Sequence, residues 1–277
     1  MKASSGDLHL SASDLSNHLA CRHLTSLDFG VALGEKSAPT WHSPDLWVLQ
    51  KRGLEHETAY IAHLTAQGLS VVDMRDGSEA QAGTDAPTPE GNYVGFIAAE
   101  ASSDVSDCGE DNSINEVETA MKKGVDVIVQ PYLAFGRWFG RADVLRRVEQ
   151  PSKLGTWSYE VHDCKLALET KATTILQLSL YSECLAAIQG KWPEYMHVVP
   201  PGDEFVSEPY RVSDYAAYYR YVKRRLEDAV ENDGSTTDTY PEPTPHCSIC
   251  RWWAECDGQR RKDDHLELRP LRALCRP

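Results

Sequence analysis

The stretch GRADVLRRVEQPSKLGTWSYEVHDCKLA, residues 140–167, decides the fold. Two runs rich in Val, Leu and aromatic residues flank PSKLG, whose proline and glycine are typical of a turn. We expect strands over residues 139–148 and 156–167 that pair as a hairpin. A further strand is expected over 125–133, and two more around the PPGD turn within 193–212.

Helical periodicity surrounds this predicted sheet. Helices are expected over residues 15–30, capped by Ser13 or Asp14, over 45–68, over 173–190 and over 214–232. The glycines at 30, 68 and 190 are typical helix stops. The pattern predicts an α/β or α+β chain with a mixed sheet of four or five strands flanked by helices.

We divide the 277 residues of the single expected domain into four parts. These are a helical N-terminal part (1–70), an acidic insertion (76–118), a core (119–230) and a cysteine cluster (240–265). Of the net charge of −14, the insertion supplies −11, because it holds eleven acidic residues and no Lys or Arg. It reads as a loop or a partly disordered insertion, with some structure expected in YVGFIAA, so the overall charge does not exclude a nucleic-acid partner.

The cellular compartment bears on the eight cysteines. The N-terminal sequence lacks a basic start followed by an apolar stretch, and no apolar run is long enough to span a bilayer. We therefore expect a cytoplasmic protein without a membrane partner. In that reducing compartment, clustered cysteines indicate metal binding or catalysis more often than disulfides.

The hairpin carries the candidate chemistry. Asp163 and Lys165 share one face of the second strand, because side chains alternate along a strand. Asp143 on the first strand presents a second carboxylate beside them. Two carboxylates suit Mg²⁺ or Mn²⁺, and the lysine can position a water or neutralise developing charge. Taken alone, an Asp–Lys pair of this kind is more often a solvated surface pair.

Two helices add polar groups. Gln177 and Tyr181 lie four residues apart on one face of the helix that follows the hairpin. His56 in the long helix could be a metal ligand, although a lone helical histidine is more often a surface or core residue. Gly53 in the same helix costs about 1 kcal/mol against alanine, which predicts close packing there.

The order G-x-x-H, G-R-A-D, D-x-K and Q-x-x-x-Y resembles the RecB-like nucleases of the PD-(D/E)XK superfamily. The resemblance implies a restriction-endonuclease-like fold, with His56, Asp143, Asp163 and the main-chain carbonyl of Cys164 as metal ligands. It implies Lys165 as the catalytic lysine, and Gln177 and Tyr181 as the third motif. Ala142 stands where the superfamily pattern has proline.

Three cysteines fall in HCSICRWWAEC, residues 246–256, and a fourth lies in the first helix. The sequence is similar to the iron–sulfur branch of these nucleases, which includes AddB and CRISPR-associated exonucleases. That similarity implies a [4Fe–4S] cluster on Cys21, Cys247, Cys250 and Cys256. On spacing alone zinc is favoured, with nitrogen from His18, His23 or His246. Redox chemistry at the C-x₂-C pair lacks the expected βαβ context.

These features together predict a metal-dependent DNA nuclease that acts on single strands or duplex ends. A helicase or another nucleic-acid-processing protein is the kind of protein partner that fits. The helix over 214–232 could contact DNA through a basic and aromatic set, or its tyrosines could be core: Tyr218, Tyr219, Tyr221, Lys223, Arg224 and Arg225. The alternatives are a nucleic-acid-binding module that does not cut, and a zinc-stapled interaction domain.

Overall fold

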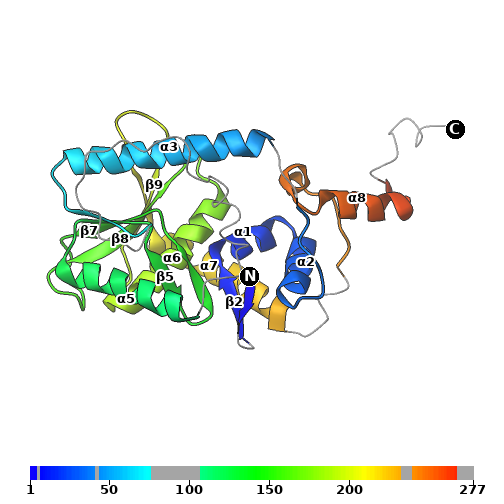
Figure 1. Cartoon of the computed structure of the whole chain (residues 1–277), viewed down its shortest axis with the longest axis horizontal. Coiled ribbons are helices and arrows are strands. Elements are labelled where there is room, and N and C mark those ends of the chain that lie inside the picture. The colour runs from blue at the N-terminus through cyan, green and yellow to red at the C-terminus, as the bar shows by residue number, and fades with distance from the viewer. Residues whose placement is uncertain (5–6, 41–43, 76–106, 232–238, 267–277) are drawn as a thin grey trace.

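The computed structural model describes residues 1–4, 7–40, 44–75, 107–231 and 239–266. Its seven α-helices and two mixed sheets are shown in Figure 1. The elements in chain order are β1 (Lys2–Ser4), β2 (Asp7–Ser11), α1 (Ala12–Ala20), α2 (Arg22–Ala32), α3 (Pro44–Ala66), β3 (Val71–Asp73), α5 (Asp107–Lys123), β4 (Val127–Val129), β5 (Tyr132–Phe135), β6 (Trp138–Arg141), β7 (Val144–Val148), β8 (Ser158–Cys164), α6 (Ala172–Gln189), β9 (Tyr195–Val199), β10 (Glu208–Arg211), α7 (Val212–Glu231), the 3₁₀ turn η2 (Pro245–Ile249) and α8 (Trp253–Lys262). Within these ranges, no helix has the length and apolar content that a membrane span requires.

The central hairpin is confirmed. Strands β7 and β8 pair antiparallel, with Leu145 opposite Val161. They form the middle of a six-stranded sheet in the order β10-β9-β8-β7-β4-β3, in which β9 runs parallel to β8. A second sheet has the order β1-β2-β6-β5.

Helices cover both faces of the six-stranded sheet (Figure 1). On one face, Tyr60 and Leu64 of α3 pack on four valines: Val127, Val129, Val144 and Val199. On the other face, helices α5 and α6 pack on Ile128, Leu145 and Val161 in the main core. Alternate residues of each strand therefore enter different cores, as the period of two requires.

Two expected strands are each broken in two. Residues 125–133 form β4 and β5 in different sheets, because Gln130 has a positive φ of 51° and Pro131 has no N–H to donate. Residues 139–148 likewise divide into β6 and β7 on either side of Ala142 and Asp143. The two breaks lie side by side, since the Gln130 N–H donates to the Asp143 carbonyl over 2.8 Å.

The first expected helix is also wrong in its bounds. It forms two helices, α1 and α2, with an extended break at Cys21. The N-terminal cap of α1 is Ser11, whose hydroxyl accepts from the Asp14 N–H in a capping box. The strand β2 just before it was not expected, and it joins the second sheet by pairing parallel to β6.

The acidic insertion does not stay irregular to its end. Residues 107–118, which were read as loop, belong to α5, a helix that continues to Lys123. Val117, Ala120 and Met121 give α5 a buried apolar side that holds it on the sheet. Residues 76–106, and with them YVGFIAA, lie outside the described residues.

Close packing occurs at Gly140 and not at Gly53, where it was expected. A methyl group on Gly140 of β6 would lie 2.8 Å from Cε1 of the buried Tyr181. A methyl group on Gly53 of α3 would meet nothing within 4 Å.

We expect opposite effects from one added methyl group at these two glycines. Gly140→Ala should lower the free energy of unfolding by about 1–3 kcal/mol, because the Tyr181 ring must shift inside the core. Gly53→Ala should raise it by about 0.5–1 kcal/mol, because alanine is the better helix former and the site is open. Urea denaturation of both variants measures this, and equal effects would contradict the packing described.

Candidate functional site

At the end of β8, the carboxylate of Asp163 and the ammonium of Lys165 lie in contact. Asp163 is 1% exposed, and the Nζ of Lys165 lies 2.9 Å from its Oδ1 and 2.8 Å from its Oδ2. The side chain of Lys165 remains about one-third exposed (31%). The predicted face sharing is therefore correct, and the lysine links a buried carboxylate to the surface.

Asp143 lies beside this pair, at the break between β6 and β7. Its Oδ2 accepts a hydrogen bond of 2.8 Å from the Cys164 N–H. Asp143 is close enough to raise the pKa of Asp163 by charge repulsion. The expected second carboxylate is thus in place, and its side chain is fixed by the main chain of the opposite strand.

A third carboxylate, Glu57, was missed by the sequence reasoning. It projects from α3, is 6% exposed, and accepts a 2.8 Å hydrogen bond from the Gln130 side chain. Its charge acts on Asp143 and on the Cys164 thiol. The sequence held no signal for Glu57, because its burial follows from the packing of α3 on the sheet.

Burial and mutual repulsion dominate the electrostatics of this group. Burial, then the charge of Asp143, raises the pKa of Glu57 to about 7. Burial is also the main effect on Asp163, where it raises the pKa against the opposing charge of Lys165. Burial alone would lower the pKa of Lys165, but Asp163 and Asp143 raise it above its usual value. The lysine therefore stays charged beside acids that repel one another.

The helix α6 brings Gln177 to the site but keeps Tyr181 in the core. The Nζ of Lys165 lies 3.5 Å from the Gln177 Oε1. Tyr181 is 4% exposed and packs against Gly140 of β6. Gln177 therefore contacts the candidate site through Lys165.

His56 lies at the edge of the site. Its Nε2 lies 3.0 Å from the Val199 carbonyl oxygen, and its ring stacks on Phe205. The same carbonyl accepts from the Lys165 N–H. The main chain of β9 thus engages one ring nitrogen of His56, and a ligand role for His56 stays a prediction.

The donor set fits a hard divalent cation. Glu57, Asp143 and Asp163 supply carboxylate oxygens, which Mg²⁺ and Mn²⁺ prefer. The Asp163 Oδ2 is buried and lies 2.8 Å from the Lys165 Nζ, so a cation would share this oxygen with the ammonium. No set of three or more His, Cys, Asp or Glu side chains in the described ranges already has ligating geometry. To bind an ion, these side chains would have to adjust their positions.

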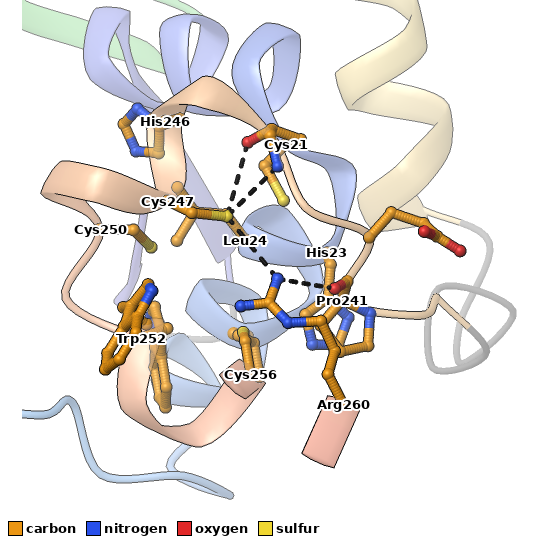
Figure 2. Close-up of a pocket in the computed structure, with 14 residues that line it drawn as sticks. Cys21, His23, Leu24, Pro241, His246, Cys247, Cys250, Trp252, Cys256 and Arg260 are labelled. Carbon is orange, nitrogen blue, oxygen red and sulfur yellow. Dashed lines mark hydrogen bonds between the residues drawn. The ribbon is translucent and has the colours of Figure 1, made fainter. Parts of the chain in front are cut away.

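The four cysteines of the predicted cluster line one pocket, which lies between α2 and the segment 241–260. Figure 2 shows Cys21 from the break between α1 and α2 facing Cys247, Cys250 and Cys256. The remaining wall is largely apolar and includes Leu24 and Trp252. All four cysteines therefore surround one pocket, and their role as ligands of a cluster stays a prediction.

Hydrogen bonds to one sulfur favour a thiolate. The Cys247 Sγ accepts from the Thr244 N–H over 3.4 Å and faces an Arg260 nitrogen at 4.0 Å (Figure 2). Burial would raise the pKa of this thiol, but these partners outweigh burial and lower it. Burial raises the pKa of Cys256 to about 11, and the neighbouring cysteines add to that shift. A pocket lined by four cysteines, one of which favours the thiolate, could hold a metal centre if the sulfurs drew closer together, since they do not have ligating geometry here.

Polar contacts hold the cysteine segment on α2. Asp28 accepts 2.6 Å and 2.8 Å hydrogen bonds from Arg251 and from the Trp252 indole. Lys36 pairs with Glu255 over 3.1 Å. The colours in Figure 1 place α8, near the C-terminal end, beside the N-terminal α2.

The nitrogen ligands of the zinc alternative differ in position. His23 and His246 line the cysteine pocket, whereas His18 does not and its Nδ1 lies 3.1 Å from the Thr25 hydroxyl. The Nδ1 of His23 is engaged with Thr239 at 2.9 Å. Because four sulfurs already face the pocket, a four-coordinate site needs no histidine.

The basic and aromatic helix α7 is divided between core and surface. Tyr219 is buried, and its hydroxyl donates to the Glu183 carboxylate. Lys223 donates to the same carboxylate, so both residues hold α7 against α6. Tyr221 is 57% exposed and carries the Arg225 guanidinium over its ring. The side of the helix that carries Tyr221 and Arg225 is therefore exposed to a partner.

No protein-family model matches this chain, and a search of curated proteins gave no match either. Support for a function therefore comes from the geometry of the two sites and from the order of the motifs.

The raised pKa of Glu57 gives a pH dependence that can be measured in EDTA. The folded chain binds the Glu57 proton more tightly than the unfolded chain, so the free energy of unfolding should fall as pH rises from about 4.5 to 7. Glu57→Gln should flatten this slope and be more stable than the wild type at pH 8, by on the order of 1–3 kcal/mol. The exposed Glu149→Gln serves as the control. An unchanged slope in Glu57→Gln would show that the acid is not in this environment.

Proposed function

We propose that the chain is a metal-dependent nuclease that hydrolyses phosphodiesters in DNA. The observation that carries this proposal is the convergence of Glu57, Asp143 and Asp163 with Lys165 at the end of β8. A buried group of acids with one retained lysine is costly for stability, since the acids repel one another and lose hydration. Such costs are typical of a functional site.

The chemistry follows from the groups present. Glu57, Asp143 and Asp163 would hold Mg²⁺ or Mn²⁺, which supplies a Lewis acid and activates water when bound. Lys165, fixed by Asp163 and near Gln177, presents its ammonium where a phosphate enters from the surface. It can neutralise the negative charge that develops on the phosphate oxygens.

The resemblance to RecB-like nucleases supports the same proposal. The D…D-x-K residues that carry the resemblance meet in space, and the mixed sheet with helices on both faces is compatible with a restriction-endonuclease-like core. Single strands or duplex ends are the substrates that this resemblance favours.

The decisive assay uses labelled single- and double-stranded DNA with Mg²⁺ or Mn²⁺. Asp163→Asn and Lys165→Met should each lower cutting by about 100-fold or more, because they remove a cation ligand and the positive charge at the phosphate. Glu57→Gln should lower the cutting rate by a similar factor. Glu149→Gln, an exposed acid that follows β7 in the same hairpin, should cut like the wild type.

The outcomes separate the candidate functions. Equal cutting by wild type and Asp163→Asn would place the activity in a contaminant or at another site. Retention of DNA without cutting by the metal-loaded wild type would identify a binding module instead of an enzyme.

We further propose that Cys21, Cys247, Cys250 and Cys256 hold a structural [4Fe–4S] cluster. Their common pocket and the hydrogen bonds to the Cys247 sulfur support a cysteine-only metal centre. The iron–sulfur choice over zinc rests on the resemblance alone. Such a centre would clamp α2 to the segment 246–256, which closes a loop of more than two hundred residues.

Anaerobic purification followed by iron, sulfide and zinc analysis tests the clamp. Cys256→Ala should lose the metal and lower Tm by several degrees, because the α2 contact loses its cross-link. Cys184→Ala, a buried cysteine in the main core, should keep the metal although it also loses packing. Zinc without sulfide in the wild type would replace the iron–sulfur assignment by a structural zinc site.

A further inference from the structure

A second cavity, of about 570 Å³, lies between α6, α7 and the loop before β9. Its floor includes the buried Tyr219 and Val212, and its rim carries Trp192, Arg211, Arg220 and Glu194. Ser179 of α6 also lines it, about 200° around the helix from Gln177, so the cavity lies on the opposite side of α6 from the carboxylate site. The volume is that of a small-molecule site.

The rim has groups that fit an aromatic ring and an anion together. Trp192 is 50% exposed, so its indole face is open to stacking. Arg211 and Arg220 are exposed and form no ion pair among the described residues. Arg211 is oriented by the Tyr195 ring, over which its guanidinium lies, and by a 3.2 Å bond to the Tyr195 hydroxyl. Two available guanidinium groups beside an open indole match a phosphate attached to a base.

Of the two carboxylates that line the cavity, Glu183 is already paired, whereas Glu194 adds a negative charge that acts on Arg211. Glu183 is neutralised, because it accepts from both Tyr219 and Lys223. Glu194 accepts from the Gln150 side chain over 3.3 Å and can also accept from a base amine or a sugar hydroxyl. An acceptor beside two guanidinium groups favours a nucleotide over inorganic phosphate.

We propose that this cavity binds a nucleoside phosphate, with the base on Trp192 and the phosphate at Arg211 and Arg220. The nucleotide is either free or one unit of a strand. The free form stands on the cavity alone, whereas the strand form rests on the proposed nuclease function.

The test is titration calorimetry on the full chain in EDTA with the Asp163→Asn substitution, so that no strand is cut. The titrants are a deoxynucleoside 5′-monophosphate, the corresponding nucleoside, inorganic phosphate and a short 5′-phosphorylated oligonucleotide. Trp192→Leu should raise Kd about tenfold through lost stacking, and Arg220→Gln should raise it by a similar factor. Lys122→Gln on α5, exposed and outside the cavity, is the control.

Each result has one meaning. Binding of the monophosphate that both cavity variants weaken supports a site for a free nucleotide. Binding of the oligonucleotide alone, weakened by the same variants, supports a site for the strand. Equal affinity for inorganic phosphate and the monophosphate, or binding that neither variant changes, overturns the proposal. Because no readout depends on cutting, an inactive nuclease would leave these conclusions intact.

Discussion

Two main-chain hydrogen bonds join the two places where the chain leaves the six-stranded sheet: the Gln130 N–H donates to the Asp143 carbonyl, and the Ala142 N–H donates to the Pro131 carbonyl. Both strands are interrupted there, so the regular pairing of the six-stranded sheet ends at residues 130 and 143. Asp143 then bonds the Cys164 N–H, and Gln130 bonds Glu57. The carboxylate group therefore depends on an interruption of the sheet, and regular strands through residues 130 and 143 would not assemble it.

The sequence was sufficient where local patterns decide the structure. The hairpin, α6 with its glycine stop and the Asp163–Lys165 pairing follow from alternation and from turn residues. It was insufficient where a long-range contact decides. The breaks at Gln130 and Cys21 interrupt runs that look continuous, and the short β2 is stabilised by parallel pairing with a strand more than one hundred residues later.

The candidate site shows the same division. Asp143, Asp163 and Lys165 could be found because one hairpin carries all three. Glu57 could not be distinguished from its neighbours, since only the packing of α3 on the sheet decides that Glu57 faces inward while His56 meets the β9 main chain. The position of Tyr181 in α6 likewise depends on a distant residue, because only a glycine at position 140 of β6 leaves room for the Tyr181 ring.

The contact between α2 and the cysteine segment has a consequence for biosynthesis. Leu24 and Leu27 are covered by Trp252, so this apolar face has no cover until residue 252 has left the ribosome. At about 5–20 residues per second, the wait lasts on the order of ten seconds or more. During that time the nascent chain presents an apolar helix and an unpaired thiol at Cys21. Any protein that binds the nascent chain therefore meets the first half of this pocket long before the second half exists.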